Sequence, residues 1–144
     1  MADFKNILVA VDVSNEASTV LKKAIDISVK FNSKISVLHV VEPVIIDPAI
    51  ELTPIFSNDI ETALVDRANN FLAEEIKMYD KYNIEFRVLL GSIKRTVHQE
   101  AIDSSADLIV VGTHGRHGIG RLLGSTASAV LHGAPCDVLI VKIA

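Results

Sequence analysis

Short unbroken runs of apolar residues alternate along the chain with longer stretches in which apolar residues recur every three or four positions. The first run covers 7–11 and ends at Asp12. Unbroken runs are typical of strands buried on both faces of a parallel sheet, whereas the wider spacing is typical of helices with one buried face. The pattern predicts strands at 7–11, 34–41, 84–90, 107–112 and 138–143, and helices at 15–31, 59–81, 93–105 and 125–132.

The first helix follows a residue that suits a helix start. Ser14 has a hydroxyl that can accept a hydrogen bond from a free N–H of the first turn, which predicts Ser14 as the N-cap. The residues expected to be buried are Ala17, Val20, Leu21, Ala24, Ile25 and Ser28 in the first helix, and Ile60, Ala63, Leu64, Phe71 and Leu72 in the second.

The segment 42–58 contains Pro43, Pro48 and Pro54. Proline lacks a backbone N–H and clashes with the preceding helical turn, so we expect neither a regular helix nor a central strand here. Because connections in compact domains are usually shorter, the length of this segment indicates a lid or an interface.

The alternation of strands and helices predicts an α/β protein, with a parallel sheet and helices on both faces. No internal repeat or linker interrupts it, so we expect one domain over 1–144. In such sheets, ligands bind beyond the carboxyl ends of the strands, where the strand order reverses. If the first and fourth strands are neighbours at that point, Asp12 and Gly112 face the same crevice.

Composition and charge narrow the class of protein. Of 144 residues, 49% are hydrophobic, which excludes intrinsic disorder, and the single cysteine, Cys136, excludes a disulfide framework or a multi-cysteine zinc site. With 14 basic and 18 acidic side chains the net charge is −4, which argues against nucleic acid or an anionic membrane as partner. No uncharged apolar run reaches the ~18–20 residues of a membrane span, and no secretory signal is apparent. We therefore expect a cytoplasmic protein.

The segment 112–126 carries the clearest chemical signal. Its glycines lie between a predicted strand and a predicted helix, and they allow backbone N–H groups to approach an anion. The hydroxyls of Ser125 and Thr126 can hold a phosphate at the start of that helix. The stretch from Leu108 to Cys136 contains no Asp or Glu, although the protein is acidic. A solvated surface turn is the alternative, but position and charge together favour anion binding.

Two common phosphate motifs are missing. The chain contains no G-x-x-x-x-G-K-[ST], and residues 10–14 after the first strand read Ala-Val-Asp-Val-Ser instead of a G-x-G-x-x-G. A P-loop enzyme and a standard NAD-binding domain are therefore disfavoured.

Four segments together resemble the universal stress protein family: ILVAVDVS at 7–14, HVVEP at 39–43, VVGTHGRHGIGRLLGST at 110–126 and HGAPCDVLIV at 132–141. The likeness covers the whole chain and implies a Rossmann-like three-layer sandwich around a five-stranded parallel sheet. ATP-binding members carry G-x2-G-x9-G-[ST], which Gly112, Gly115 and Gly124-Ser125 match except that eight residues separate the last two glycines. The shorter interval could be absorbed within the glycine loop, or could favour AMP or ADP over ATP.

The resemblance also implies an adenine-nucleotide site, for ATP, ADP or AMP. It places Gly112, Gly115, Gly124, Ser125 and Thr126 on the phosphates and ribose, with His114 and Arg116 flanking the phosphates. It places Asp12 near the ribose or a bound Mg²⁺, and Ala10, Val11, Val40 and Val41 around the adenine.

Single residues leave alternatives open. Asp12 could equally cap the turn before the first helix, and a lone carboxylate holds Mg²⁺ only with phosphate and water. His114 and His117 lack a third ligand at suitable spacing, so a metal pair is disfavoured. No carboxylate accompanies Ser125 in its loop, so no catalytic residue is predicted. His39 lies in an apolar strand and is expected to be a hydrogen-bonded core residue.

The last strand, at 138–143, would offer unpaired backbone groups to another chain if it forms an edge of the sheet. The resemblance implies a homodimer through this strand and a further, unknown protein partner. It implies a nucleotide-dependent module of stress response or signalling. A dimeric stress protein that binds no nucleotide, and a slow ATP hydrolase, are the alternatives.

Overall fold

The described part of the chain alternates strands and helices, as the apolar pattern predicts. The computed structural model describes residues 3–43, 54–113 and 123–143, with the backbone alone for 54–58. The strands are β1 (Asn6–Ala10), β2 (Lys34–Val41), β3 (Glu85–Leu90), β4 (Leu108–Gly112) and β5 (Asp137–Val141). The helices are α1 (Ala17–Phe31), α2 (Pro54–Lys77), the 3₁₀ helix η1 (Asp80–Tyr82), α3 (Ile93–Asp103) and α4 (Ser125–Leu131).

The five strands form one sheet in the order β3-β2-β1-β4-β5, and every neighbouring pair is parallel. The chain builds the sheet outward from β1 through β2 to β3, then returns to the other side of β1 with β4. The strand order therefore reverses between β1 and β4, where Ala10 pairs in register with Val111. The predicted five-stranded parallel sheet is confirmed, and so is the adjacency of the first and fourth strands.

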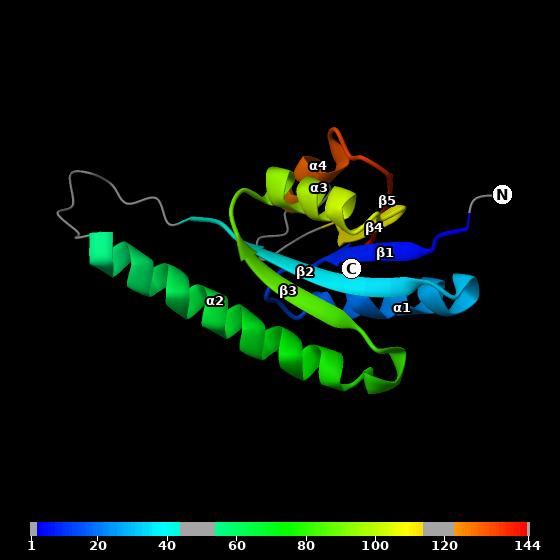
Figure 1. Cartoon of the computed structure of the whole chain (residues 1–144), viewed down its shortest axis with the longest axis horizontal. Coiled ribbons are helices and arrows are strands. Elements are labelled where there is room, and N and C mark those ends of the chain that lie inside the picture. The colour runs from blue at the N-terminus through cyan, green and yellow to red at the C-terminus, as the bar shows by residue number, and fades with distance from the viewer. Residues whose placement is uncertain (1–2, 44–53, 114–122, 144) are drawn as a thin grey trace.

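Two hydrophobic cores lie on opposite faces of this sheet. Figure 1 shows α1 and α2 on one side of the strands, and α3 and α4 on the other. Val9 of β1 packs in the core that includes residues of α1 and α2, whereas Leu8 packs in the core that includes residues of α3 and α4. Because successive side chains of a strand point to opposite faces, β1 needs apolar residues at every position. This requirement explains why the sequence shows an unbroken apolar run at β1.

The predicted start of α1 is wrong. Ser14 does not cap the helix, which begins at Ala17 with Glu16 at the cap position and no side-chain cap hydrogen bond. The Ser14 hydroxyl instead donates to Oδ1 of Asp12 over 3.2 Å, and its N–H donates to the Asp12 carbonyl over 3.0 Å. This local turn competes with capping, as short polar side chains commonly do.

The predicted bounds of the second helix are also wrong. The helix α2 begins at Pro54 and ends at Lys77, so the final turn of the proline-rich segment 42–58 is helical. Proline fits the first helical position because that position needs no N–H partner. The buried face of α2 includes Leu72, as predicted, with Ala68 and Ile76 at four-residue spacing, whereas Ala63 is exposed. No helix in the described ranges is both long enough and apolar enough to cross a membrane.

Replacement of Leu72 by alanine should lower the free energy of unfolding by about 2–5 kcal/mol, because it removes a buried side chain and leaves a cavity. Leu72 is 1% exposed, whereas Leu131 at the end of α4 is 42% exposed. The matched control Leu131→Ala should therefore cost much less. Urea unfolding of both variants measures the difference, and equal losses would contradict the assignment of Leu72 to the core.

Candidate functional site

A cavity of about 330 Å³ lies beyond the carboxyl ends of β1 and β2. Residues from both sides of the sheet line it, since α2 belongs to one face and α3 and α4 belong to the other. This is where an open parallel sheet offers a crevice to a ligand. The lining comprises Ala10, Val11, Asp12, Val13, Leu38, His39, Val40, Val41, Glu42, Leu64, Arg67, Ile93, Val97, Gly124, Ser125 and Thr126.

Backbone and side-chain hydrogen bonds fix the floor of this cavity at the end of β1. The N–H of Val11 donates to the Leu38 carbonyl over 3.0 Å, which extends the pairing of β1 with β2. Nδ1 of His39 lies 2.8 Å from the Val11 carbonyl oxygen. Because a carbonyl only accepts, His39 carries a proton on Nδ1 in this contact. His39 is hydrogen bonded as predicted, but it is half-buried and faces the cavity.

Carboxylates follow both strands at the cavity wall. Asp12 comes two residues after the end of β1, and Glu42 comes directly after β2. The Ser14 hydroxyl donates to Asp12, which holds that carboxylate in place, whereas Glu42 is exposed. Over the described residues, no group of three or more His, Cys, Asp or Glu side chains could hold a metal ion. Any cation at Asp12 would therefore draw most of its ligands from elsewhere.

Thr113 joins the end of β4 to β5 and to the start of α4. Its carbonyl accepts from the N–H of Gly124 over 2.6 Å, so the two ends of the glycine-rich segment are tied together. Its N–H donates to the Val141 carbonyl over 2.9 Å, and its Oγ1 accepts from the N–H of Ile143 over 3.0 Å. Gly124, Ser125 and the residues behind them are thereby held at the cavity mouth.

The structure brings most of the predicted site residues to one cavity. Gly112 is an exception, because it is buried in β4 and does not line the cavity. The residues His114, Gly115 and Arg116 lie outside the described residues. Those that line the cavity are Ala10, Val11, Asp12, Val40, Val41, Gly124, Ser125 and Thr126.

Sequence reasoning missed the contributions of the helices to this wall. Leu64 and Arg67 of α2 lie three residues apart, a spacing that puts them on one side of the helix, yet no motif distinguishes them from other helical residues. The place of Glu42 in the cavity wall could have been predicted, because Glu42 directly follows a strand at the carboxyl edge of the sheet. The remaining residues that were missed are Val13, Leu38, His39, Ile93 and Val97.

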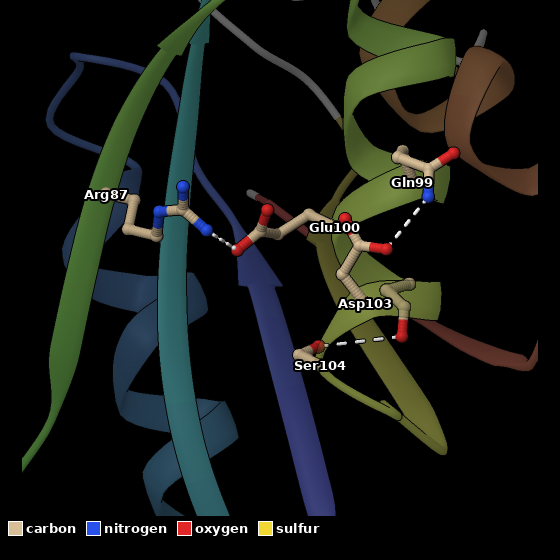
Figure 2. A network of polar contacts seen from close by, with 6 residues as sticks. Arg87, Gln99, Glu100, Asp103 and Ser104 are labelled. Carbon is tan, nitrogen blue, oxygen red and sulfur yellow. Dashed lines mark hydrogen bonds and ion pairs between the residues drawn. The ribbon is translucent and has the colours of Figure 1, made fainter.

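A second cavity, of about 290 Å³, lies near the amino ends of β1, β2 and β3 and beside α3. Figure 2 shows Arg87 of β3 and Glu100 of α3 pointing toward each other across β2. Their Nη1 and Oε1 atoms lie 2.6 Å apart, and Gln99 donates to Asp103 over 2.9 Å on the same helix. The Arg87 side chain is 60% exposed, so the ion pair contributes at most about 1 kcal/mol.

Cys136 lies just before β5 and is half-buried against the core that α3 and α4 cover. Burial raises the pKa of its thiol, and the nearby carboxylates of Asp107 and Asp137 raise it further. A raised thiol pKa means less thiolate at neutral pH, so Cys136 is a poor nucleophile.

Fold and cavity together define a doubly wound α/β protein with a cavity at the carboxyl edge of its parallel sheet. A family model for the universal stress protein family matches residues 3–142, and the chain belongs to this family. The resemblance seen in the sequence is thereby confirmed.

Known relatives match this chain over nearly its whole length. Universal stress protein A homolog 1 of Coxiella burnetii is 35% identical over 138 residues, covering 96% of both chains. Universal stress protein A homolog 2 of the same organism is 36% identical over 147 residues, covering 99% of this chain and 98% of the relative.

Solved structures agree with the fold. The universal stress protein UspA from Lactobacillus plantarum has a TM-score of 0.84 and 26% identity, covering 98% of this chain and 99% of its own. A universal stress protein crystallised in complex with cAMP has a TM-score of 0.63 and 26% identity, covering 98% of both chains.

Replacement of Thr113 by valine should lower the free energy of unfolding by about 1 kcal/mol, because it leaves the N–H of Ile143 without its acceptor. Thr113→Ser keeps the hydroxyl and serves as the control, with a smaller loss. Chemical denaturation of the two variants provides the comparison. Equal losses would show that the hydroxyl contact contributes nothing.

Proposed function

We propose that this protein binds an adenine nucleotide in the cavity at the carboxyl ends of β1 and β2, and that it acts as a nucleotide-dependent module of the stress response. The observation that carries the proposal is the convergence of the predicted residues from β1, β2 and the start of α4 on one cavity. A related universal stress protein forms a complex with cAMP, which itself contains adenine and a phosphate. That relative supports the class of ligand.

The lining offers suitable chemistry for each part of the nucleotide. Apolar side chains, among them Val11 and Val41, suit the flat face of the base. The hydroxyls of Ser125 and Thr126 can donate hydrogen bonds to phosphate oxygens. Asp12 would contact the ribose, or a Mg²⁺ ion carried by the nucleotide, with phosphate and water oxygens as the other ligands.

The proposal includes a homodimer that forms through β5. This strand is an edge of the sheet and pairs only with β4 among the described strands. Its outer backbone groups can therefore pair with a second copy of the strand. The proposal also includes a cytoplasmic location, as expected from the sequence, and a protein partner that responds to the nucleotide state, which rests on the family resemblance.

Isothermal titration calorimetry with ATP, ADP and AMP tests the proposal on the purified protein. We expect saturable binding of at least one of the three, and their order of affinity shows how the short glycine interval affects the phosphate chain. Mass spectrometry of small molecules released by denaturing fresh protein identifies the nucleotide carried from the cell. Absence of both heat and a thermal shift at millimolar nucleotide would exclude the proposal.

Replacement of Gly124 by tryptophan should abolish nucleotide binding, because Gly124 lines the cavity and a large side chain there would occupy its space. The backbone can accept the new side chain, since φ at Gly124 is −62°. Leu131→Trp adds the same side chain at an exposed position outside the cavity and should bind nucleotide normally. If Gly124→Trp binds as tightly as the parent protein, the nucleotide lies elsewhere.

A further inference from the structure

We propose that Arg67 and Leu64 of α2 form the wall of the cavity against which the nucleotide base stacks. This inference rests on the proposed function, because it assigns the base to one end of the same cavity. Both residues line the cavity, and their three-residue spacing puts them on one side of the helix. The protein would then bind the base with a helix that the phosphate motif does not include.

The position of α2 relative to α4 separates the two ends of the ligand. Figure 1 shows α2 and α4 on opposite sides of the sheet, with α2 extending beyond the carboxyl ends of the strands. Ser125 and Thr126 begin α4, so a phosphate that they hold lies on the face opposite to Arg67. If the phosphates bind at these hydroxyls, the nucleotide extends across the strand ends. Its base, and not its phosphates, then lies at α2.

The carboxylates around the cavity favour the same orientation. The carboxylates of Asp12 and Glu42 belong to the ends of β1 and β2, whereas the sequence from Leu108 to Cys136 has no carboxylate. Phosphates placed near Asp12 and Glu42 with no cation between them would be repelled by like charge, and an uncharged base would not. Leu64 adds an apolar surface beside Arg67, which suits a base and not a phosphate.

The guanidinium of Arg67 is free to take this role. Arg67 is exposed, and it forms no hydrogen bond or ion pair with any residue in the described ranges. A planar guanidinium can lie flat on an aromatic ring, which combines stacking with a cation–π contact. Stacking of this kind depends only on the aromatic face of the base. It should therefore strengthen the binding of nucleosides and nucleotides to the same extent.

The test measures how Arg67→Ala changes affinity for adenosine, AMP, ATP and inorganic tripolyphosphate. We expect a loss of roughly 3- to 30-fold, the range set by cation–π contacts, that is the same for the three adenine compounds. Binding of tripolyphosphate should not change. Arg95→Ala, an exposed arginine of α3 outside both cavities, is the matched control for charge and should bind all four ligands like the parent.

Ultraviolet difference spectra give a second readout, which reports on the surroundings of the base. The protein contains no tryptophan, so the adenine band dominates the signal. The band should shift when ATP binds to the parent protein, because the base leaves water for the cavity, and the shift per bound nucleotide should be smaller with Arg67→Ala.

Three results would overturn the inference, and they differ from failure of the proposed function. A loss for ATP and tripolyphosphate without a loss for adenosine would make Arg67 a phosphate contact. Unchanged affinity for all four ligands in Arg67→Ala, or an unchanged spectrum, would show that Arg67 does not touch the base. If the parent protein binds none of the adenine compounds, the proposed function itself is wrong.

Discussion

The site depends on one constraint of the sheet: the chain leaves the neighbouring strands β1 and β4 toward opposite faces. After β1 the chain turns to α1, which packs in one core, and after β4 it continues to α4, which packs in the other. Since β1 and β4 are hydrogen-bonded neighbours, the helices that follow them lie on opposite faces of the sheet. Residues at the ends of β1 and β2 and the first residues of α4 line the cavity at this edge of the sheet.

Thr113 connects this opening to the edge of the sheet. Its backbone and hydroxyl contact Gly124, Val141 and Ile143, so the cavity mouth and the end of β5 share one small hydrogen-bonded junction. A ligand that shifts the start of α4 therefore acts on the same groups that position the last strand. The junction therefore joins the start of α4 directly to the end of β5.

The sequence could predict the sheet and half of the site, for physical reasons that particular residues illustrate. The strand β2 has the predicted bounds, and an almost continuous run of apolar residues marks it in the sequence. The starts of helices were less predictable. Ser14 could either cap the first helix or form a turn with Asp12, and the structure contains the turn. Residues after strands could be assigned to the crevice by topology alone. Leu64 and Arg67 could not, since their place depends on how far α2 extends past the strands.

The distribution of charge across the cavity gives the site a direction. At the strand ends of β1 and β2 the wall carries Asp12 and Glu42, while the hydroxyl residues Ser125 and Thr126 lie on the side of α4. A ligand that is anionic at one end and aromatic at the other meets opposite conditions in its two possible orientations. Because repulsion between like charges grows as water is excluded from a closed site, the wrong orientation becomes less favourable as the ligand enters more deeply. Carboxylates at this end of the cavity would therefore disfavour a phosphate there and favour one orientation of a bound nucleotide.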